Sequence, residues 1–469
     1  MVGPDYHRPP VELPGSFPGP APDAASSASE RADWWTLFDD PRLNELVALA
    51  LANNADVRRA VARIEETDAN LRAANAALFP EIDLGAAATR SSTSFAIALP
   101  PPPGTPSVRN DLRLALSGSY LVDFWGKLRR GVEASRAQTL GSRYAGDVVR
   151  LSLASLTTQT YFSLRSLDAQ IATTRNTLAT RSDGLSLVRR RVDAGYASDL
   201  DLRQAEGLTT DAAAQLKELI RQRALAEHLL GVLTGKLDLV VGAGDITQLP
   251  QPALPPPGVP SRLLERRPDV RVAEQNLIAE NALIGVALAQ QFPTISLTGI
   301  YGGESAALAS LLTGPGRLWS VGVGLTMPLF DAGRLDALTD AERARFRQTL
   351  AAYEQTIQTS FREVADALTN VAQYRALEAD FEAGVASARE ALRLATRRYE
   401  AGYSGYLDVL EAQRNANISE LLLIRNRQAL LGADVALMTA LGGGWQPADL
   451  QASRSAQQDV PGSAAGVTR

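Results

Sequence analysis

The sequence of 469 residues contains no cysteine, only two histidines and only three methionines. Without cysteine there is no disulfide framework, no thiolate metal site and no thiol nucleophile. Two histidines cannot build a rich metal site, and few soft ligands are left for copper or silver. The net charge of −5, with both signs interspersed, does not suggest binding to nucleic acid.

No group of residues points to catalysis, because the sequence has no Ser/His/Asp set, no phosphate-binding loop and no Walker lysine. We therefore expect no catalytic residue, no cofactor and no metal site. No window approaches the roughly 18 apolar residues of a membrane-spanning helix. The first residues also lack the charged and apolar regions of a signal peptide. Composition alone indicates a soluble, alanine-rich and mostly helical protein.

One phrase of seventeen residues occurs twice. RRVDAGYASDLDLRQAE starts at Arg190, RRYEAGYSGYLDVLEAQ starts at Arg397, and the two agree at eight positions. Other pairs keep nearly the same spacing: DVRRA with DVRVA, LFPEIDL with QFPTISL, and Phe124 with Phe330. The spacing falls from 213 to 206 positions across the stretch LPPPPGTP, so the first copy has the longer loop there. The pattern predicts a two-fold internal duplication.

Each half begins with the same order of elements. A helix is predicted over Asp56–Leu78 and again over Pro268–Gln290, because Phe-Pro follows each one and disfavours helix. Residues of alternating polarity then predict a β-hairpin at about 80–124 and another at about 293–330.

A very long helix with a near-heptad apolar seam follows each hairpin. Both long helices are predicted to end at Ala-Gly-Tyr, since glycine is the favoured residue just past a helix end. A second helix then returns. Gly195 and Gly402 are thus predicted to mark the tips of two long helical hairpins.

The predicted strands have one apolar face and one small or polar face. Trp319, Val321 and Val323, for example, alternate with Ser320 and Gly322. Such strands resemble the wall of an outer-membrane barrel. Four strands cannot close a barrel and an open edge cannot exist in lipid, so at least two chains would be needed, and three would supply twelve strands. The alternative is a soluble β-sandwich with one wet face.

Five phrases across roughly residues 1–445 carry a family resemblance. They are VGPDYHRPP from Val2, DWWTLFDDPRLNELVALALANNADVRRA from Asp33, LLERRPDVRVAEQNLIAENALIGVALAQQFPTISL from Leu263, PLFDAGR from Pro328 and RRYEAGYSGYLDVLEAQR from Arg397. In these phrases the chain resembles the TolC/OprM-like outer membrane factors, specifically the NodT-like outer membrane lipoproteins of RND-type efflux pumps.

The resemblance implies an α+β membrane protein. Its fold would be a homotrimeric transmembrane β-barrel of twelve strands, four from each chain, on a long periplasmic α-helical barrel. Its function would be the passive outer-membrane exit duct of a tripartite RND-type multidrug pump in a Gram-negative bacterium. The implied partners are two further copies of the chain, a periplasmic adaptor (membrane fusion protein), an inner-membrane RND transporter and outer membrane lipid, but no nucleic acid. The same fold could instead serve type I protein secretion or copper and silver efflux, and a soluble coiled-coil scaffold is a further alternative.

The domain organisation follows from the duplication. We expect an N-terminal segment and equatorial part (1–55), a first repeat (56–240), a linker (241–262), a second repeat (263–445) and a disordered C-terminal tail (446–469). Trp34 and Trp35 are expected to pack the N-terminal segment onto the equatorial part.

The candidate site residues belong to the two tips. By the family pattern, Leu407, Asp408 and Glu411 would form the pore constriction, where three copies of each carboxylate would repel one another and attract cations. The residues expected at the tips and in contact with the adaptor are Gly195, Tyr196, Asp199, Leu200, Asp201, Gly402, Tyr403 and Tyr406. Ordinary solvated acids and turn chemistry are the alternatives. Arg397 and Arg398 could form ion pairs in the closed state or be plain surface charges near a helix end.

The family also implies a lipid anchor. Its mature chains usually begin with an acylated and palmitoylated cysteine just before VGPDY, whereas this sequence has Met1 there and no cysteine. We expect that in the native form a lipidated cysteine stands at or before Met1.

Overall fold

The computed structural model describes residues 1–17, 33–92, 106–252 and 263–443, together with residues 94, 102 and 104. The predicted tail at 446–469 lies outside the described residues. Among the helices of the described part, none combines the length and the apolar character that crossing a membrane requires.

The two halves contain matching elements in the same order. The first half has α2 (Ala55–Ala76), β1 (Glu81–Ser92), β2 (Val108–Val122), α3 (Lys127–Asp193) and α4 (Asp199–Thr234). The second half has α6 (Pro268–Ala289), β3 (Thr294–Ser305), β4 (Arg317–Thr326), α7 (Arg334–Glu400) and α8 (Tyr406–Ala440). The paired elements α2 and α6 each have 22 residues, β1 and β3 each have 12, and α3 and α7 each have 67. The internal repeat predicted from the sequence is therefore present in the structure.

Shorter elements lie before the first half, between the two halves and, for η4 and η5, between β3 and β4. They are η1 (Trp34–Phe38), α1 (Pro41–Asn53), η2 (Ile246–Gln248), α5 (Leu263–Arg266), η4 (Leu308–Ser310) and η5 (Gly314–Gly316). The start of α1 is set locally, because the Asp40 side chain accepts hydrogen bonds from the backbone N–H groups of Arg42 and Leu43. Pro41 suits the first helical position, where no N–H is needed.

The chain forms two compact units. Unit 1 contains Met1–Pro10, Arg63–Arg143 and Val272–Glu354. Unit 2 contains Val11–Ala62, Tyr144–Arg271 and Gln355–Arg469. The β-strands belong to unit 1 and both helical tips belong to unit 2.

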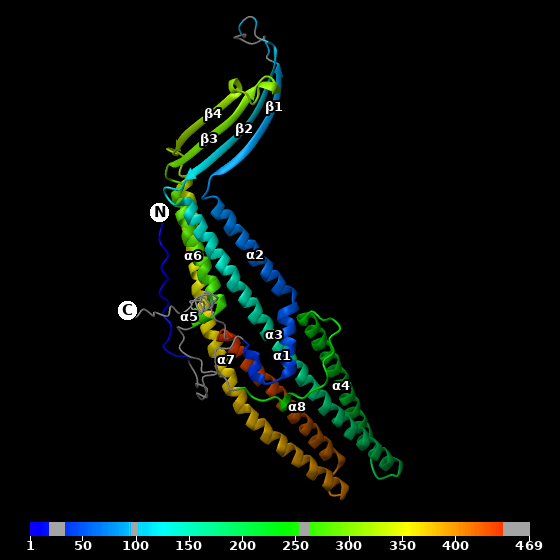
Figure 1. The fold of residues 1–469 in the computed structure, drawn as a ribbon. Helices are drawn as coiled ribbons and strands as arrows, with labels where there is room; N and C mark the ends of the chain where they lie inside the picture. Colours follow the sequence, from blue (N-terminus) through cyan, green and yellow to red (C-terminus); the bar gives the residue numbers. More distant parts are fainter. Residues whose placement is uncertain are drawn as a thin grey trace, which may run out of the picture. The chain divides into compact units, whose positions relative to one another are not determined.

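The four strands of unit 1 form one antiparallel sheet in the order β1-β2-β3-β4 (Figure 1). β2 pairs with β3, so the two predicted hairpins join into a single sheet. Leu116 on β2 lies opposite Leu84 on β1 and opposite Tyr301 on β3. The sheet register therefore aligns residues from both halves of the sequence on the same face.

The first ten residues are bound to the helices of unit 1. Arg8 forms a salt bridge with Glu274 at 2.6 Å. The buried Arg130 guanidinium bonds Asp5 at 2.7 Å, and the backbone N–H of Val2 donates to the carbonyl of Trp125. An extended segment with no helix or strand of its own is thus held by charged side chains.

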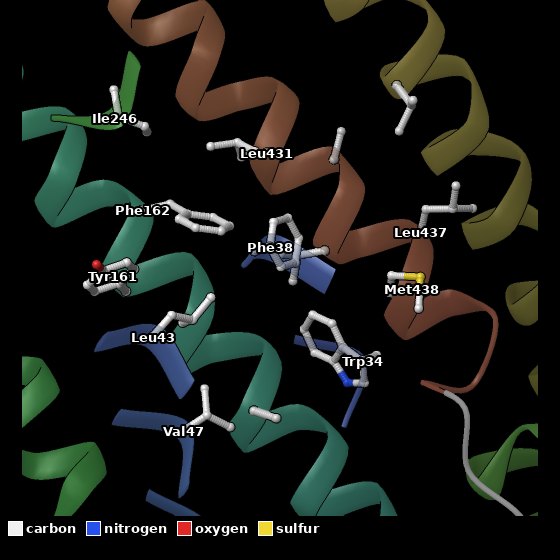
Figure 2. Close-up of a cluster of buried hydrophobic side chains, with 14 of the residues drawn as sticks. Trp34, Phe38, Leu43, Val47, Tyr161, Phe162, Ile246, Leu431, Leu437 and Met438 are labelled. Carbon is white, nitrogen blue, oxygen red and sulfur yellow. The ribbon is translucent and has the colours of Figure 1, made fainter. Parts of the chain in front are cut away.

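The largest apolar core lies in unit 2. Figure 2 shows the rings of Trp34 and Phe38 between α3 and α8. The ring of Phe38 meets that of Phe162 edge to face, with centroids 5.0 Å apart. Trp34 is almost fully buried and Trp35 packs against the cluster, as expected from the sequence.

Most of the predicted apolar seam of α7 is buried, while Phe346, Leu350 and Phe361 are half-buried. Tyr353 and Ile357 are four positions apart, Val364 follows one heptad after Ile357, and Leu368 and Val371 follow at steps of four and three; all five have almost no exposed surface. Helices of this length depend on such a stripe, because isolated helices gain little stability from their backbone alone.

Candidate functional site

The sheet of unit 1 has one apolar face along its whole width. One row across the four strands is Leu84, Leu116, Tyr301 and Trp319. On β4 the apolar face continues through Val321, Val323 and Leu325, and Trp319 and Val321 are 71% and 80% exposed in the single chain. An exposed apolar surface of this extent needs a cover.

The other face carries the charges. Asp83 and Ser117 lie opposite each other there, as do Arg113 and Glu304. In the described strands, charged residues occur on the apolar face only at the end nearest the β3–β4 loop, at Arg90 and Arg317. The two faces therefore suit two different surroundings, one apolar and one aqueous.

Both edges of the sheet are open. Among the described residues, β1 pairs only with β2 and β4 pairs only with β3. Each edge strand therefore has backbone N–H and C=O groups without a partner in the sheet, and in a membrane these groups must pair with another strand.

Aromatic rings gather where the sheet meets the helices of unit 1. Trp125 stacks on Phe292 with centroids 4.6 Å apart and meets Phe124 edge to face at 4.9 Å. The Trp125 indole N–H donates to the carbonyl of Pro293 at 2.8 Å. Phe330 is 90% exposed near the end of β4. Aromatic side chains at this level are typical of the membrane–water interface of a barrel.

The two tips in unit 2 share one turn geometry. Gly195 and Gly402 have φ values of +75° and +78°, a left-handed conformation that glycine adopts without strain. At the first tip the N–H groups of Gly195 and Tyr196 bond the carbonyls of Val192 and Arg191. At the second, Gly402 and Tyr403 make the same two bonds to Tyr399 and Arg398. Both are Schellman motifs, so the repeated phrase encodes a repeated helix end.

The predicted tip residues differ in exposure. Tyr196 and Tyr403 are 85% and 80% exposed, and Leu200 is 65% exposed. Asp199 is exposed in the first turn of α4, and Asp201 is half-buried there. All of these side chains except that of Asp201 are available for contact with a second molecule in the single chain.

Tyr406 is placed differently, because it is only 7% exposed. It belongs to a small core that we call the tip core, formed by Val188, Ala205, Tyr406, Val409 and Leu410. The tip core packs the α3–α4 hairpin onto the α7–α8 hairpin. Burial is the main cause of a raised pKa of the Tyr406 hydroxyl. The contact with an adaptor that we predicted for Tyr406 would require this core to open.

The predicted constriction residues lie on one exposed side of α8. Leu407 is 52% exposed, and Asp408 and Glu411 are also exposed. Within the described part of the chain, neither carboxylate forms a salt bridge. The structure thus brings the three residues together on the first turns of α8.

The predicted arginine pair lies in the last turn of α7. Arg397 and Arg398 are both exposed and, among the described residues, form no salt bridge. A different arginine takes part in the packing of the tips: the Arg191 guanidinium lies over the ring of Tyr399, 4.5 Å from its centroid.

The residues that hold the linker between the repeats in place were not predicted from the sequence. Arg223 bonds Asp168 at 2.7 Å and the carbonyl of Val241 at 2.6 Å. Glu227 accepts from the N–H of Val241 at 2.7 Å. Arg223 and Glu227 lie 18 and 14 positions before Val241, so these bonds are fairly local, whereas Asp168 comes from a distant part of α3.

The same linker is also fastened to the second hairpin. Arg427 on α8 bonds Glu378 on α7 at 2.9 Å and donates to the carbonyl of Leu249 at 2.6 Å. Gln251 bonds the Glu378 carboxylate as well. Residues 241–251 therefore connect both hairpins within unit 2.

A buried acid lies close to this second fastening. Asp434 on α8 has no exposed surface, and neither carboxylate oxygen has a hydrogen-bond partner among the described residues. Burial raises its pKa to about 7, although Arg375 and Arg427 act in the opposite direction.

Comparison with known proteins identifies the family to which this architecture belongs. The family model described as outer membrane efflux protein matches residues 46–236 and 259–443. Outer membrane protein OprJ of Pseudomonas aeruginosa is 36% identical over 450 residues, which span 95% of this chain and 93% of OprJ. The toluene efflux pump outer membrane protein TtgF of Pseudomonas putida is 34% identical over 94% of this chain and 93% of its own length. The cation efflux system protein CusC of Escherichia coli is 31% identical over 95% of this chain and 96% of its own length.

Solved structures show the same fold. A membrane protein from Pseudomonas aeruginosa superposes with a TM-score of 0.87 at 35% identity, over 95% of this chain and 98% of that one. The CmeC outer membrane channel of Campylobacter jejuni superposes with a TM-score of 0.88 at 25% identity, over 97% of this chain and 98% of CmeC.

The matches confirm the fold class predicted from the sequence. The four strands are the share that one chain contributes to a transmembrane β-barrel, and the long helices are its share of a helical barrel, as in the trimeric channels of this family. They also confirm an outer-membrane location with extension into the periplasm, and a passive efflux duct rather than an enzyme. The chain belongs to the outer membrane efflux protein family.

Proposed function

We propose that the chain forms the exit duct of a tripartite RND-type pump that expels small organic molecules, and that an adaptor and an inner-membrane transporter open it at the helical tips. The main observation in support of a duct is that the sheet has an uncovered apolar face, a polar face and two open edges. Three copies would give twelve strands, pair every edge and enclose the polar face around water.

Organic cargo is supported by the relatives. OprJ and TtgF are more similar to this chain than CusC is, and TtgF is named for toluene efflux. CusC is named for cation efflux, so metal ions are the second candidate cargo. Within the described residues no cluster of three or more His, Cys, Asp or Glu side chains could hold a metal ion. A duct for type I protein secretion is the remaining alternative.

The gate is proposed at Leu407, Asp408 and Glu411. Their exposed position on the first turns of α8 leaves them free to meet their copies around a three-fold axis. Three leucine side chains would narrow the opening, and rings of carboxylates would attract cations and repel one another. Opening would be a movement of the α7–α8 hairpin away from the α3–α4 hairpin, at the expense of the tip core.

The adaptor is proposed to bind the exposed tips. Tyr196 and Tyr403 occupy matching positions of the repeat and are both largely exposed. A partner that recognises one tip would therefore find a similar aromatic group on the other. Arg397 and Arg398 are proposed to pair with acids of a neighbouring copy when the duct is closed.

A lipid anchor is proposed for the native form. The bond from Val2 to Trp125 holds the first residues beside the aromatic rings at the base of the sheet. A lipidated cysteine at or before Met1 would then place its acyl chains at the membrane interface.

The gate is tested by conductance across a planar bilayer. The double variant Leu407→Ala with Glu411→Ala is compared with the wild type and with a matched control, Leu200→Ala with Gln204→Ala, which changes the same positions of the first tip. We expect low conductance for the wild type and the control, and a strong increase for the α8 variant. Equal conductance of all three proteins would contradict the assignment of the gate to these residues, while the proposed duct would stand. No conductance from any of them, in folded oligomers, would contradict the duct itself.

A further inference from the structure

A small polar cavity lies between α3 and α8 in unit 2. It has a volume of about 80 Å³ and is lined by Asn176, Thr177, Thr180, Arg181, Gln413 and Asn417, among others. Leu392 lines the cavity and also packs against the tip core, which places the cavity beside that core. A cavity of this volume has room for a small ion or a few water molecules.

Arg181 brings a buried positive charge to this cavity. The residue is only 6% exposed, and its guanidinium donates one hydrogen bond, to the carbonyl of Leu208 on α4 at 2.8 Å. Its Nε–H has no hydrogen-bond partner among the described residues, and no carboxylate there forms a salt bridge with it. Buried charges in proteins are normally paired, because desolvation of an isolated charge is costly.

The nearest acids do not supply the missing partner. The exposed Asp211 acts on Arg181 only as a charge at a distance and opposes the lowering of its pKa that burial causes. Glu420 also lines the cavity, but its carboxylate accepts from Arg389 at 2.7 Å. The charge of Arg181 is therefore not balanced by a contact within the described part of the chain.

The remaining polar lining can donate hydrogen bonds. The carbonyl oxygen of Asn417 accepts from the Thr177 hydroxyl at 2.9 Å, which leaves the NH2 group of Asn417 for another acceptor. The Gln413 carbonyl oxygen has no partner among the described residues, so it can accept a hydrogen bond from a water molecule beside a bound ion. A buried positive charge beside a free amide donor is chemistry that recognises an anion.

We propose that the cavity binds a small monovalent inorganic anion of halide size, held by the Arg181 guanidinium on α3 and the Asn417 amide on α8. Such an ion contacts both helical hairpins and favours the arrangement in which they are packed together. Water would satisfy the same donors but would leave the charge of Arg181 unbalanced.

Bromide identifies the site directly, because it scatters X-rays anomalously and replaces chloride. Crystals of the wild-type protein and of Arg181→Gln are grown in sodium bromide. We expect an anomalous peak beside the Arg181 guanidinium in the wild type and none in the variant. An intact cavity that contains only water at saturating bromide would overturn the proposal, and this result requires no variant.

Thermal unfolding in solution gives a second test. Sodium gluconate is exchanged for sodium bromide at constant ionic strength, with Arg175→Gln as a control that removes an exposed arginine of the same helix. We expect a saturable rise in the unfolding temperature of a few °C for the wild type and the control, and none for Arg181→Gln. The same rise in all three proteins would assign the effect to other sites and contradict the proposal.

Discussion

The two helical tips have nearly the same sequence and turn but use their acids differently. At the first tip the Ser198 side chain accepts from the N–H of Asp201, and the Asp201 carboxylate accepts from the N–H of Ser198, which completes a capping box. At the second tip Gly405 takes the place of Ser198 and offers no side-chain cap. Asp408, the counterpart of Asp201, is therefore exposed and free of this role. The aspartate at this position of the repeat thus takes part in a capping box at the first tip and is exposed without one at the second.

A second matched pair lies at the other end of the same helices. Glu227 on α4 corresponds to Asp434 on α8. Glu227 accepts from Arg223 at 2.9 Å and from the N–H of Val241, whereas the oxygens of Asp434 have no partner in the described residues. Related positions of a duplicated chain can thus hold an acid in opposite electrostatic situations.

Substitution by alanine should change the free energy of unfolding most differently at Tyr406 and at its counterpart in the first hairpin, Asp199. Tyr406→Ala removes a buried ring from the tip core and should lower the free energy of unfolding by about 3–5 kcal/mol, the range for buried aromatic side chains. Asp199→Ala removes an exposed side chain and should change it by less than about 1 kcal/mol. Thermal unfolding of the two purified variants measures the difference. Similar losses for both would mean that the tip core is not formed in solution.

The next prediction concerns the pH dependence of the free energy of unfolding, for which Asp434 and its counterpart Glu227 should behave differently. Between pH 4 and 7 the folded protein keeps a proton on Asp434 that the unfolded chain releases, so the free energy of unfolding should fall as the pH rises. The cost at pH 8 is on the order of 4 kcal/mol for a shift from 3.8 to about 7. Asp434→Asn should therefore be more stable than the wild type at pH 8 and similar to it at pH 4.

Glu227→Gln is the control for this pH effect. It weakens two hydrogen bonds and should destabilise the protein at both pH values without removing the pH dependence. Unfolding temperatures measured at pH 4 and pH 8 decide between the outcomes. If Asp434→Asn shows the same pH dependence as the wild type, the dependence arises from other groups.

Substitution of the two tip glycines should lower the stability by a smaller amount, which should be the same at both tips. A Cβ atom at Gly195 or at Gly402 would meet no atom within 4 Å, so substitution is opposed only by the left-handed backbone. Gly195→Ala and Gly402→Ala should each cost about 1–2 kcal/mol. The exchange rates of the backbone amide hydrogens that flank each turn measure the loss of local stability in the two variants. A cost at one tip alone would show that the two turns differ in solution.

The smallest change in stability is expected at the N-cap positions of α4 and α8, Ser198 and Gly405. Ser198→Ala should cost about 1 kcal/mol through loss of the capping box, while Gly405→Ser should gain a few tenths of a kcal/mol. The new serine would also engage Asp408, and the cation selectivity of the duct should then decrease. Reversal potentials in a salt gradient measure this change. Unchanged selectivity would argue against Asp408 as a gate residue.

Local patterns in the sequence were sufficient for most of the fold. Alternating residues predicted the strands, a heptad seam predicted α7, and Ala-Gly-Tyr predicted both tips, because each of these signals acts within a few residues. The three constriction residues were likewise brought to one exposed side of α8, since they lie within five positions of one another.

Long-range packing determined the rest. The burial of Tyr406 could not be predicted, because it depends on α3, which precedes it by about two hundred residues. The bond from Arg427 to the carbonyl of Leu249 joins positions 178 apart in sequence. The lack of a hydrogen-bond partner for Asp434 among the described residues likewise depends on how α8 packs against distant segments.

The sequence by itself therefore determined the duplication, the order and lengths of the elements, and the family. Only the tertiary structure decided which of two matched acids is paired, which tip tyrosine is buried and which arginine is left without a carboxylate. The physical reason is that periodicity and turn chemistry are local, whereas the free energy of a buried charge depends on every group that packs around it.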